Sequence, residues 1–135
     1  HTYTIFFMSK EKFELEFLVN ASAKIIYQCL STPSGLSEWF ADDVNVRDDI
    51  FTFIWEGTEE SAKIITRRKD EFVKYQWMED FEAGEKVFFE IRIHIDAMTK
   101  ELALIVTDFA EPDDIEDAKL LWASQIDALS HILGS

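Results

Sequence analysis

The sequence has few of the residues that form disulfides, ligate metals or bind phosphate groups. It has a single cysteine, Cys29, so an internal disulfide is excluded, and one thiol with no neighbouring Cys or His has no metal-ligand spacing. Its four glycines are dispersed, which excludes a glycine-rich phosphate loop. No histidine is placed for catalysis either. We therefore expect no metal ion and no other cofactor, and we assign no catalytic residue.

Basic residues are also scarce. The chain has 13 Lys and Arg against 27 Asp and Glu, a net charge of -14. A surface of this sign repels polyanions, which excludes general binding to nucleic acid and to anionic membranes. The sequence has no run of eighteen apolar residues and no signal-peptide pattern. We expect a cytoplasmic protein without membrane insertion.

Aromatic residues, by contrast, are abundant. Twelve Phe and four Trp within a hydrophobic fraction of 47% provide ample surface to bury, which excludes intrinsic disorder. A chain of 135 residues fits a single core. Because Met8-Ser9-Lys10 is typical of a natural start, we expect one domain over residues 8–135, preceded by an extension at residues 1–7.

The clearest helical pattern covers residues 113–133. Its apolar positions share one broad face, formed by Ile115, Ala118, Leu121, Trp122, Ile126, Leu129, Ile132 and Leu133. Asp113 or Asp114 is expected to cap its start, and Gly134 to end it. Gln125 interrupts the apolar face. Its amide either finds a partner there, from Tyr75, a strand hydroxyl or a ligand, or reaches water at the edge of the face.

Short alternating runs separated by turn residues fill most of the remaining chain. The first, at residues 13–19, precedes two short helices at about 22–30 and 33–40, the first of which is expected to bury Ile25, Ile26, Cys29 and Leu30. Six further runs follow at 44–46, 50–56, 61–68, 72–78, 86–95 and 102–109. The turns between them are too short for parallel crossovers, so we predict an antiparallel sheet whose apolar face the C-terminal helix covers.

Several aromatic motifs resemble those of a known family. Residues 26–40 end in Leu36-x-x-Trp39-Phe40, and further aromatic motifs stand in the strand-like segments 53–57 and 73–77 and in the C-terminal segment 122–133. Together they resemble the START-like (SRPBCC) superfamily, in the branch related to the activator of the heat-shock chaperone ATPase. The resemblance spans residues 13–133. It implies an α+β helix-grip fold, in which a curved antiparallel sheet of about seven strands wraps around a long C-terminal helix, with two short helices after the first strand. It also implies a cavity between sheet and helix that holds a hydrophobic small molecule.

Inward-facing aromatic residues and one turn of the C-terminal helix form the candidate ligand site. They are Trp39, Phe40, Phe53, Trp55, Tyr75, Trp77, Phe89, Trp122, Gln125, Ile126 and Leu129. Residues of this kind either line a pocket or fill the core. The inward strand positions carry almost no Lys or Arg, so an anionic group would be uncompensated there. We predict a neutral ligand with a lipid-like or aromatic body.

Two other functions stay open. The chaperone-activator branch implies a protein partner, which predicts an exposed apolar patch outside the cavity. The superfamily resemblance also extends to enzymes of the polyketide cyclase and dehydratase type, for which Tyr75 and Gln125 are the candidate polar groups. The sequence specifies neither the identity of the ligand nor the oligomeric state.

Overall fold

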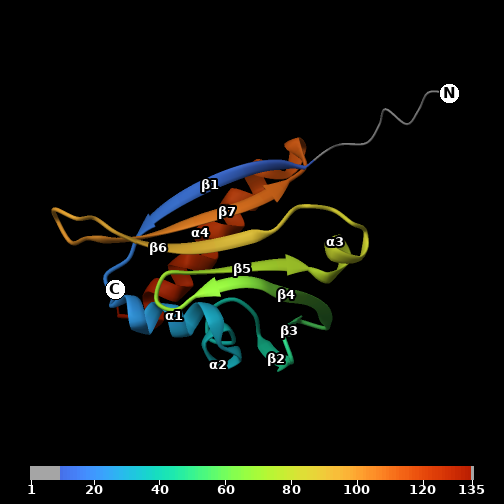
Figure 1. The fold of residues 1–135 in the computed structure, drawn as a ribbon, viewed down its shortest axis with the longest axis horizontal. Helices are drawn as coiled ribbons and strands as arrows, with labels where there is room; N and C mark the ends of the chain where they lie inside the picture. Colours follow the sequence, from blue (N-terminus) through green and yellow to red (C-terminus); the bar gives the residue numbers. More distant parts are fainter. Residues whose placement is uncertain (1–9, 135) are drawn as a thin grey trace.

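The computed structural model describes residues 10–134, so the expected extension at residues 1–7 lies outside the described residues. Seven strands form one antiparallel sheet in the order β1-β7-β6-β5-β4-β3-β2 (Figure 1). The strands are β1 (Glu11–Leu18), β2 (Asp43–Arg47), β3 (Ile50–Trp55), β4 (Thr58–Arg68), β5 (Phe72–Trp77), β6 (Phe89–Ile95) and β7 (Leu102–Ala110). The helices are α1 (Ala23–Ser31), α2 (Pro33–Leu36), α3 (Met78–Glu82), the 3-10 helix η2 (Pro112–Asp114) and α4 (Ile115–Ile132). The predicted α+β helix-grip fold is confirmed.

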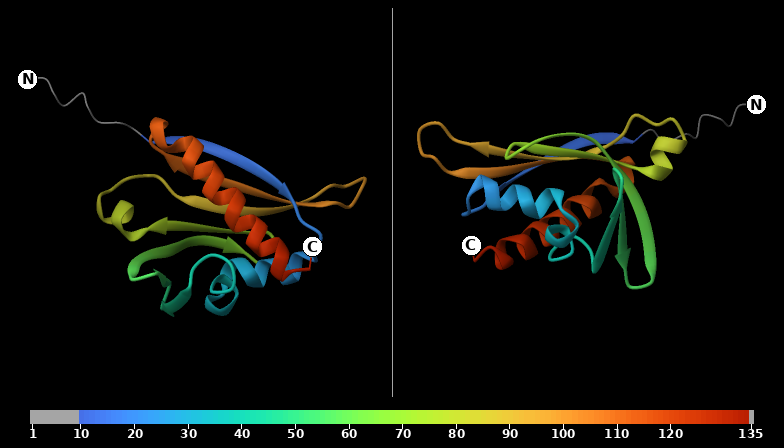
Figure 2. Two further views of the ribbon diagram at one scale, coloured as in Figure 1. Left: turned by 180° about the vertical axis from the view of Figure 1, so that it is seen from behind. Right: turned by 60° about the horizontal axis from the view of Figure 1, so that its bottom comes forward.

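The sheet is strongly curved, and its helices gather on one side. Figure 2 shows α4 crossing the sheet diagonally, with α1 and α2 beneath the same face. Helix α3 lies at the opposite end of the sheet from the hairpin between β6 and β7 (Figure 1). Within residues 10–134 no helix combines the length and the apolar character needed to cross a bilayer.

Strand alternation places one set of side chains on the covered face. Phe53 on β3, Tyr75 on β5 and Leu104 on β7 are all fully buried, since period-two side chains of an antiparallel sheet sort into a wet and a dry face. Rings stack across strands, with centroids 5.1 Å apart between Tyr75 and Phe89. Burying aromatic rings in this way is the main favourable term for the fold.

Helix α4 buries a narrower stripe than the sequence predicts. Trp122, Ile126 and Leu129 are buried, but Leu121 is 60% and Ile132 is 42% exposed, so their expected burial is wrong. A straight helix crossing a curved sheet contacts it along one stripe, which leaves the flanks of the apolar arc in solvent. The predicted cap is also wrong, because Asp114 precedes α4 without a side-chain hydrogen bond and η2 forms the entry instead.

The two short helices after β1 meet at a tight junction. The hydroxyl of Ser22 accepts a hydrogen bond from the Ile25 amide and caps α1. The expected burial of Ile25 is wrong, since its side chain is 52% exposed. The hydroxyl of Thr32 accepts from the Gly35 amide and starts α2. At Gly35 there is no room for a side chain, because a Cβ would lie 2.3 Å from the carbonyl oxygen of Gln28.

Helix α3 was not among the predicted elements. It follows Trp77 directly and occupies part of the expected turn, so β6 begins at Phe89 instead of residue 86. Five residues are too few to show a helical period in the sequence. Helix α3 contributes Met78, Glu79 and Asp80 to the cleft described next.

Candidate ligand-binding cleft

A cleft of about 790 Å³ lies between α4, α3 and the ends of the central strands. This volume falls within the range of small-molecule sites, about 300–1,000 Å³. Its walls are Lys10, Phe40, Trp55, Glu59, Glu60, Ser61, Trp77, Met78, Glu79, Asp80, Asp108, Leu121, Trp122 and Gln125. Aromatic side chains therefore meet carboxylates around one opening.

The apolar wall is a connected group of rings. The ring centroids of Phe40 and Trp55 are 5.7 Å apart, those of Phe40 and Trp122 are 6.0 Å apart, and those of Trp55 and Trp77 are 6.4 Å apart. Trp122 and Phe40 are buried, whereas Trp55 and Trp77 are half-buried. The aromatic wall thus extends from the buried core to the solvent-exposed opening of the cleft.

One backbone carbonyl joins two sides of the cleft. The carbonyl oxygen of Phe40 accepts a hydrogen bond of 2.8 Å from Nε1 of Trp55 and one of 3.2 Å from Nε2 of Gln125. The amide of Gln125 therefore has a partner different from those the sequence suggested. Because a buried polar group without a partner is costly, this arrangement favours a single orientation of both side chains.

The acidic part of the rim follows from strand register. Glu60 on β4 pairs with the buried Phe53 on β3, and Asp108 on β7 pairs with the buried Phe13 on β1. Directly paired residues lie on the same face of a sheet, so both carboxylates belong to the face that carries the core. Both lie near strand ends, where that face meets solvent.

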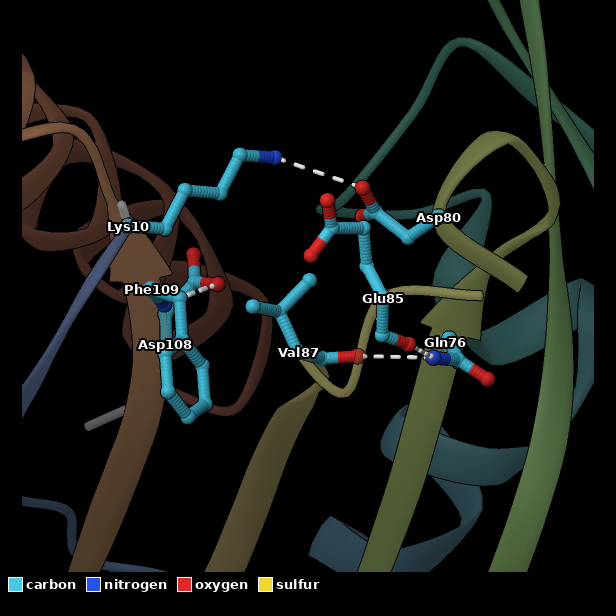
Figure 3. A network of polar contacts seen from close by, with 7 residues as sticks. All are labelled: Lys10, Gln76, Asp80, Glu85, Val87, Asp108 and Phe109. Atoms are coloured by element: carbon cyan, nitrogen blue, oxygen red, sulfur yellow. Dashed lines mark hydrogen bonds and ion pairs between the residues drawn. The ribbon is translucent and has the colours of Figure 1, made fainter. Parts of the chain in front are cut away.

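Lys10 supplies the positive charge of the rim. Its Nζ lies 3.3 Å from Oδ1 of Asp80 in the first turn of α3, joining segments seventy residues apart (Figure 3). The loop after α3 is held by Gln76, whose Nε2 donates to the carbonyls of Glu85 at 2.8 Å and Val87 at 3.0 Å (Figure 3). These bonds fix the position from which Asp80 meets the lysine.

Asp108 is the most perturbed carboxyl of the cleft. Its Oδ2 accepts a 2.8 Å hydrogen bond from Nε1 of Trp122, and its Oδ1 accepts one of 2.7 Å from the Phe109 amide. Burial nevertheless raises its pKa above the ordinary value of 3.8, because the two hydrogen bonds and Lys10 compensate the lost hydration only in part and Asp80 opposes them.

We compare the free energies of unfolding of Asp108→Asn and the wild-type protein. As the pH rises from about 3 to 7, we expect this difference to shift in favour of the variant. The raised pKa means that the unfolded chain loses this proton first, so the wild-type protein loses stability as the pH rises from 3.8 towards the folded-state pKa. The asparagine has no proton to lose, although its single oxygen accepts only one of the two hydrogen bonds. Urea unfolding at several pH values measures the difference.

Asp117→Asn is the control for this pH experiment, since it removes one charge from an exposed position of α4. If the difference in free energy of unfolding between Asp108→Asn and wild type stays constant across the pH range, the assigned effect of burial on the pKa of Asp108 is contradicted.

The structure divides the predicted site residues into two groups. Phe40, Trp55, Trp77, Trp122 and Gln125 line the cleft. The other six, Trp39, Phe53, Tyr75, Phe89, Ile126 and Leu129, are buried in the core and do not line it. A binding role for either group stays a prediction.

The polar atoms of two core residues are used internally. The hydroxyl of Tyr75 donates to the Leu30 carbonyl at 2.7 Å, and Nε1 of Trp39 donates to the Cys29 carbonyl at 2.8 Å. Burial raises the pKa of the Tyr75 hydroxyl well above its ordinary value. Tyr75 therefore holds α1 against the sheet instead of facing the cleft.

Sequence reasoning missed the charged wall of the cleft. Glu60, Asp80, Asp108 and Lys10 were not among the candidates. A signal for Asp108 exists in β7, where Leu102, Leu104 and Val106 are buried and the same alternation continues to position 108. Asp80 carries no such signal, because its position depends on α3.

The carboxylates of the cleft were also considered as metal ligands. Among residues 10–134 no group of three or more His, Cys, Asp or Glu side chains is placed to hold a metal ion.

An open antiparallel sheet curled around a C-terminal helix, with an aromatic cleft at one end, defines a helix-grip protein of the α+β class. The chain belongs to the START-like superfamily, whose domain model matches residues 7–135. No curated protein matches it significantly.

Several solved structures share the fold. BfR322 from Bacteroides fragilis is 38% identical, covering 93% of this chain and 92% of that one, with a TM-score of 0.66. The Aha1 dimer from Colwellia psychrerythraea is 18% identical, covering 91% and 96%, with a TM-score of 0.77. ChR145 from Cytophaga hutchinsonii is 13% identical, covering 94% and 97%, with a TM-score of 0.70. The last two similarities concern the fold alone.

Proposed function

We propose that the protein binds a small molecule with a hydrophobic body in the cleft beside Trp55, Trp77 and Trp122. The observation that carries the proposal is the cleft itself, about 790 Å³ in volume with a connected aromatic wall. Ring faces give a ligand a large contact area at low entropic cost, because the surrounding core already orders them. Superfamily membership supports a binding or interaction module.

A neutral fluorescent probe, N-phenyl-1-naphthylamine, tests the proposal. We expect saturable binding, with energy transfer from the tryptophans of the cleft. Leu121→Gln should weaken it about fivefold, since an apolar contact at the rim is lost. Leu121 is exposed, so the substitution leaves the core intact.

Leu120→Gln is the matched control for the probe experiment. Leu120 precedes Leu121 in α4 and is also largely exposed to solvent, but it does not line the cleft. Unsaturable binding, or an equal effect of the two substitutions, would refute binding at this site.

A second candidate function is interaction with a protein partner. Leu120 of α4 is 70% exposed and does not line the cleft, so it provides exposed apolar surface outside the cleft. Pull-down with the heat-shock chaperone tests this alternative, and Leu120→Gln should then be the variant that loses binding.

The positions of its two candidate polar groups do not favour the third function, a cyclase or dehydratase activity. The hydroxyl of Tyr75 and the amide nitrogen of Gln125 both donate to backbone carbonyls, and Tyr75 does not line the cleft. We do not propose it.

A further inference from the structure

We infer that the cleft selects an organic cation, namely an ammonium group carried by an alkyl or aryl body. This inference rests on the proposed binding function and names the chemical class of the ligand. The sequence predicts a neutral ligand, because Lys and Arg are scarce at the inward strand positions. That prediction leaves out the residues at the rim of the cleft. The charged residues that the fold brings to the rim favour a positively charged ligand.

The charge of the rim is strongly unbalanced. One lysine stands against five carboxylates, which are Glu59, Glu60, Glu79, Asp80 and Asp108. The lysine is already engaged, since Lys10 lies 3.3 Å from Asp80. The overall charge of -14 adds to the same field. A carboxylate ligand would therefore meet repulsion, whereas an ammonium group would meet attraction from several directions.

The aromatic wall is suited to the same charge. The indole N–H groups of Trp55 and Trp122 donate to Phe40 and Asp108 respectively, so neither is available to an anionic ligand. The ring faces carry partial negative charge from the quadrupole of the π system, which attracts ammonium groups within about 6 Å. Carboxylates and aromatic faces thus favour a cation together, and a hydrophobic body fills the remaining wall.

The arrangement favours an organic cation over a metal ion. Compact metal binding needs several ligands converging on one point, and no such group occurs among the described residues 10–134. The carboxylates instead come from β4, α3 and β7 and surround a volume of about 790 Å³. A cation with an apolar body matches this spread.

Calorimetric titration with four ligands that share an octyl chain tests the inference. The ligands are octylammonium, octyltrimethylammonium, octanol and octanoate, at about pH 7 and below micelle-forming concentrations. We expect both ammonium compounds to bind at least about tenfold more tightly than octanol, and octanoate to bind most weakly. Octanol binding as tightly as octylammonium, or tighter binding of octanoate, would overturn the inference.

A pair of double variants locates the effect. Glu60→Gln with Asp80→Asn removes two carboxylates of the rim and should weaken octylammonium about tenfold while changing octanol less than about twofold. Glu82→Gln with Asp117→Asn removes two exposed carboxylates that do not line the cleft, and should leave both ligands unchanged. Equal effects of the two pairs would also overturn the inference.

The outcomes separate the two proposals. If neither the octyl ligands nor N-phenyl-1-naphthylamine bind saturably, the proposed function fails. If the probe and octanol bind but the ammonium compounds gain nothing, the proposed function stands and the cationic ligand is refuted.

Discussion

Phe53→Ala is expected to destabilise the protein by about 3–5 kcal/mol, because it leaves a large cavity where the aromatic core is densest. Phe53 is fully buried, and its ring lies against the rings of five other residues: Phe40, Phe51, Trp55, Tyr75 and Trp77. Domains of this kind are stable by about 5–15 kcal/mol, so the variant will be close to unfolding. Denaturant unfolding followed by far-UV circular dichroism measures the loss, and avoids the altered fluorescence of neighbouring tryptophans.

Phe53→Leu is the control, since it keeps four of the seven side-chain carbons and should cost about half as much as Phe53→Ala. A similar loss in both variants would show that the ring contacts, and not the filled volume, dominate. A loss below about 1 kcal/mol for Phe53→Ala would contradict the central place given to this residue.

Gly35→Ala is expected to cost about 2–3 kcal/mol through overpacking at the junction of α1 and α2. The added Cβ would lie 2.3 Å from the carbonyl oxygen of Gln28 and 2.7 Å from Cα of Cys29, and both are backbone atoms that no rotamer change can move. The two helices must separate to admit it. Thermal and denaturant unfolding measure the cost.

The same substitution should weaken probe binding in the cleft. Phe40 follows α2 closely, and its carbonyl holds both Trp55 and Gln125, so a displaced α2 disturbs the aromatic wall. Ser34→Ala is the control, because it changes an exposed residue beside Gly35 and should alter stability by less than about 0.5 kcal/mol. A fully stable Gly35→Ala protein would contradict the close contact between the helices.

Much of this fold follows from sequence periodicity, because the sheet has one dry face and α4 one dry stripe. Alternation in residues 72–78 and 86–95 leads directly to β5 and β6. Helix α3 escapes such reasoning, since its five residues show no period and its existence depends on how the chain leaves Trp77. The exposure of Leu121 has a similar origin, because a helical wheel cannot show how far a curved sheet extends under the helix.

The candidate site was predictable only in part. Residue pattern shows that Phe53, Trp55, Tyr75 and Trp77 share a face, but not where the helix separates from it. The separation occurs at the strand ends, so Trp55 and Trp77 line the cleft while Phe53 and Tyr75 fill the core. The charge of the site depends on residues from distant parts of the sequence, as the pairing of Lys10 with Asp80 illustrates.

The rim of the cleft is made of side chains that solvent already reaches, including Glu59, Glu79 and Leu121. A ligand can therefore enter and leave through rotamer changes, which take picoseconds to nanoseconds at exposed positions, and no strand or helix has to move aside. Opening of the fold will therefore not limit the arrival of any head group. The preference of the cleft for one ligand over another will then be expressed as residence time, with the slowest departure marking the best match.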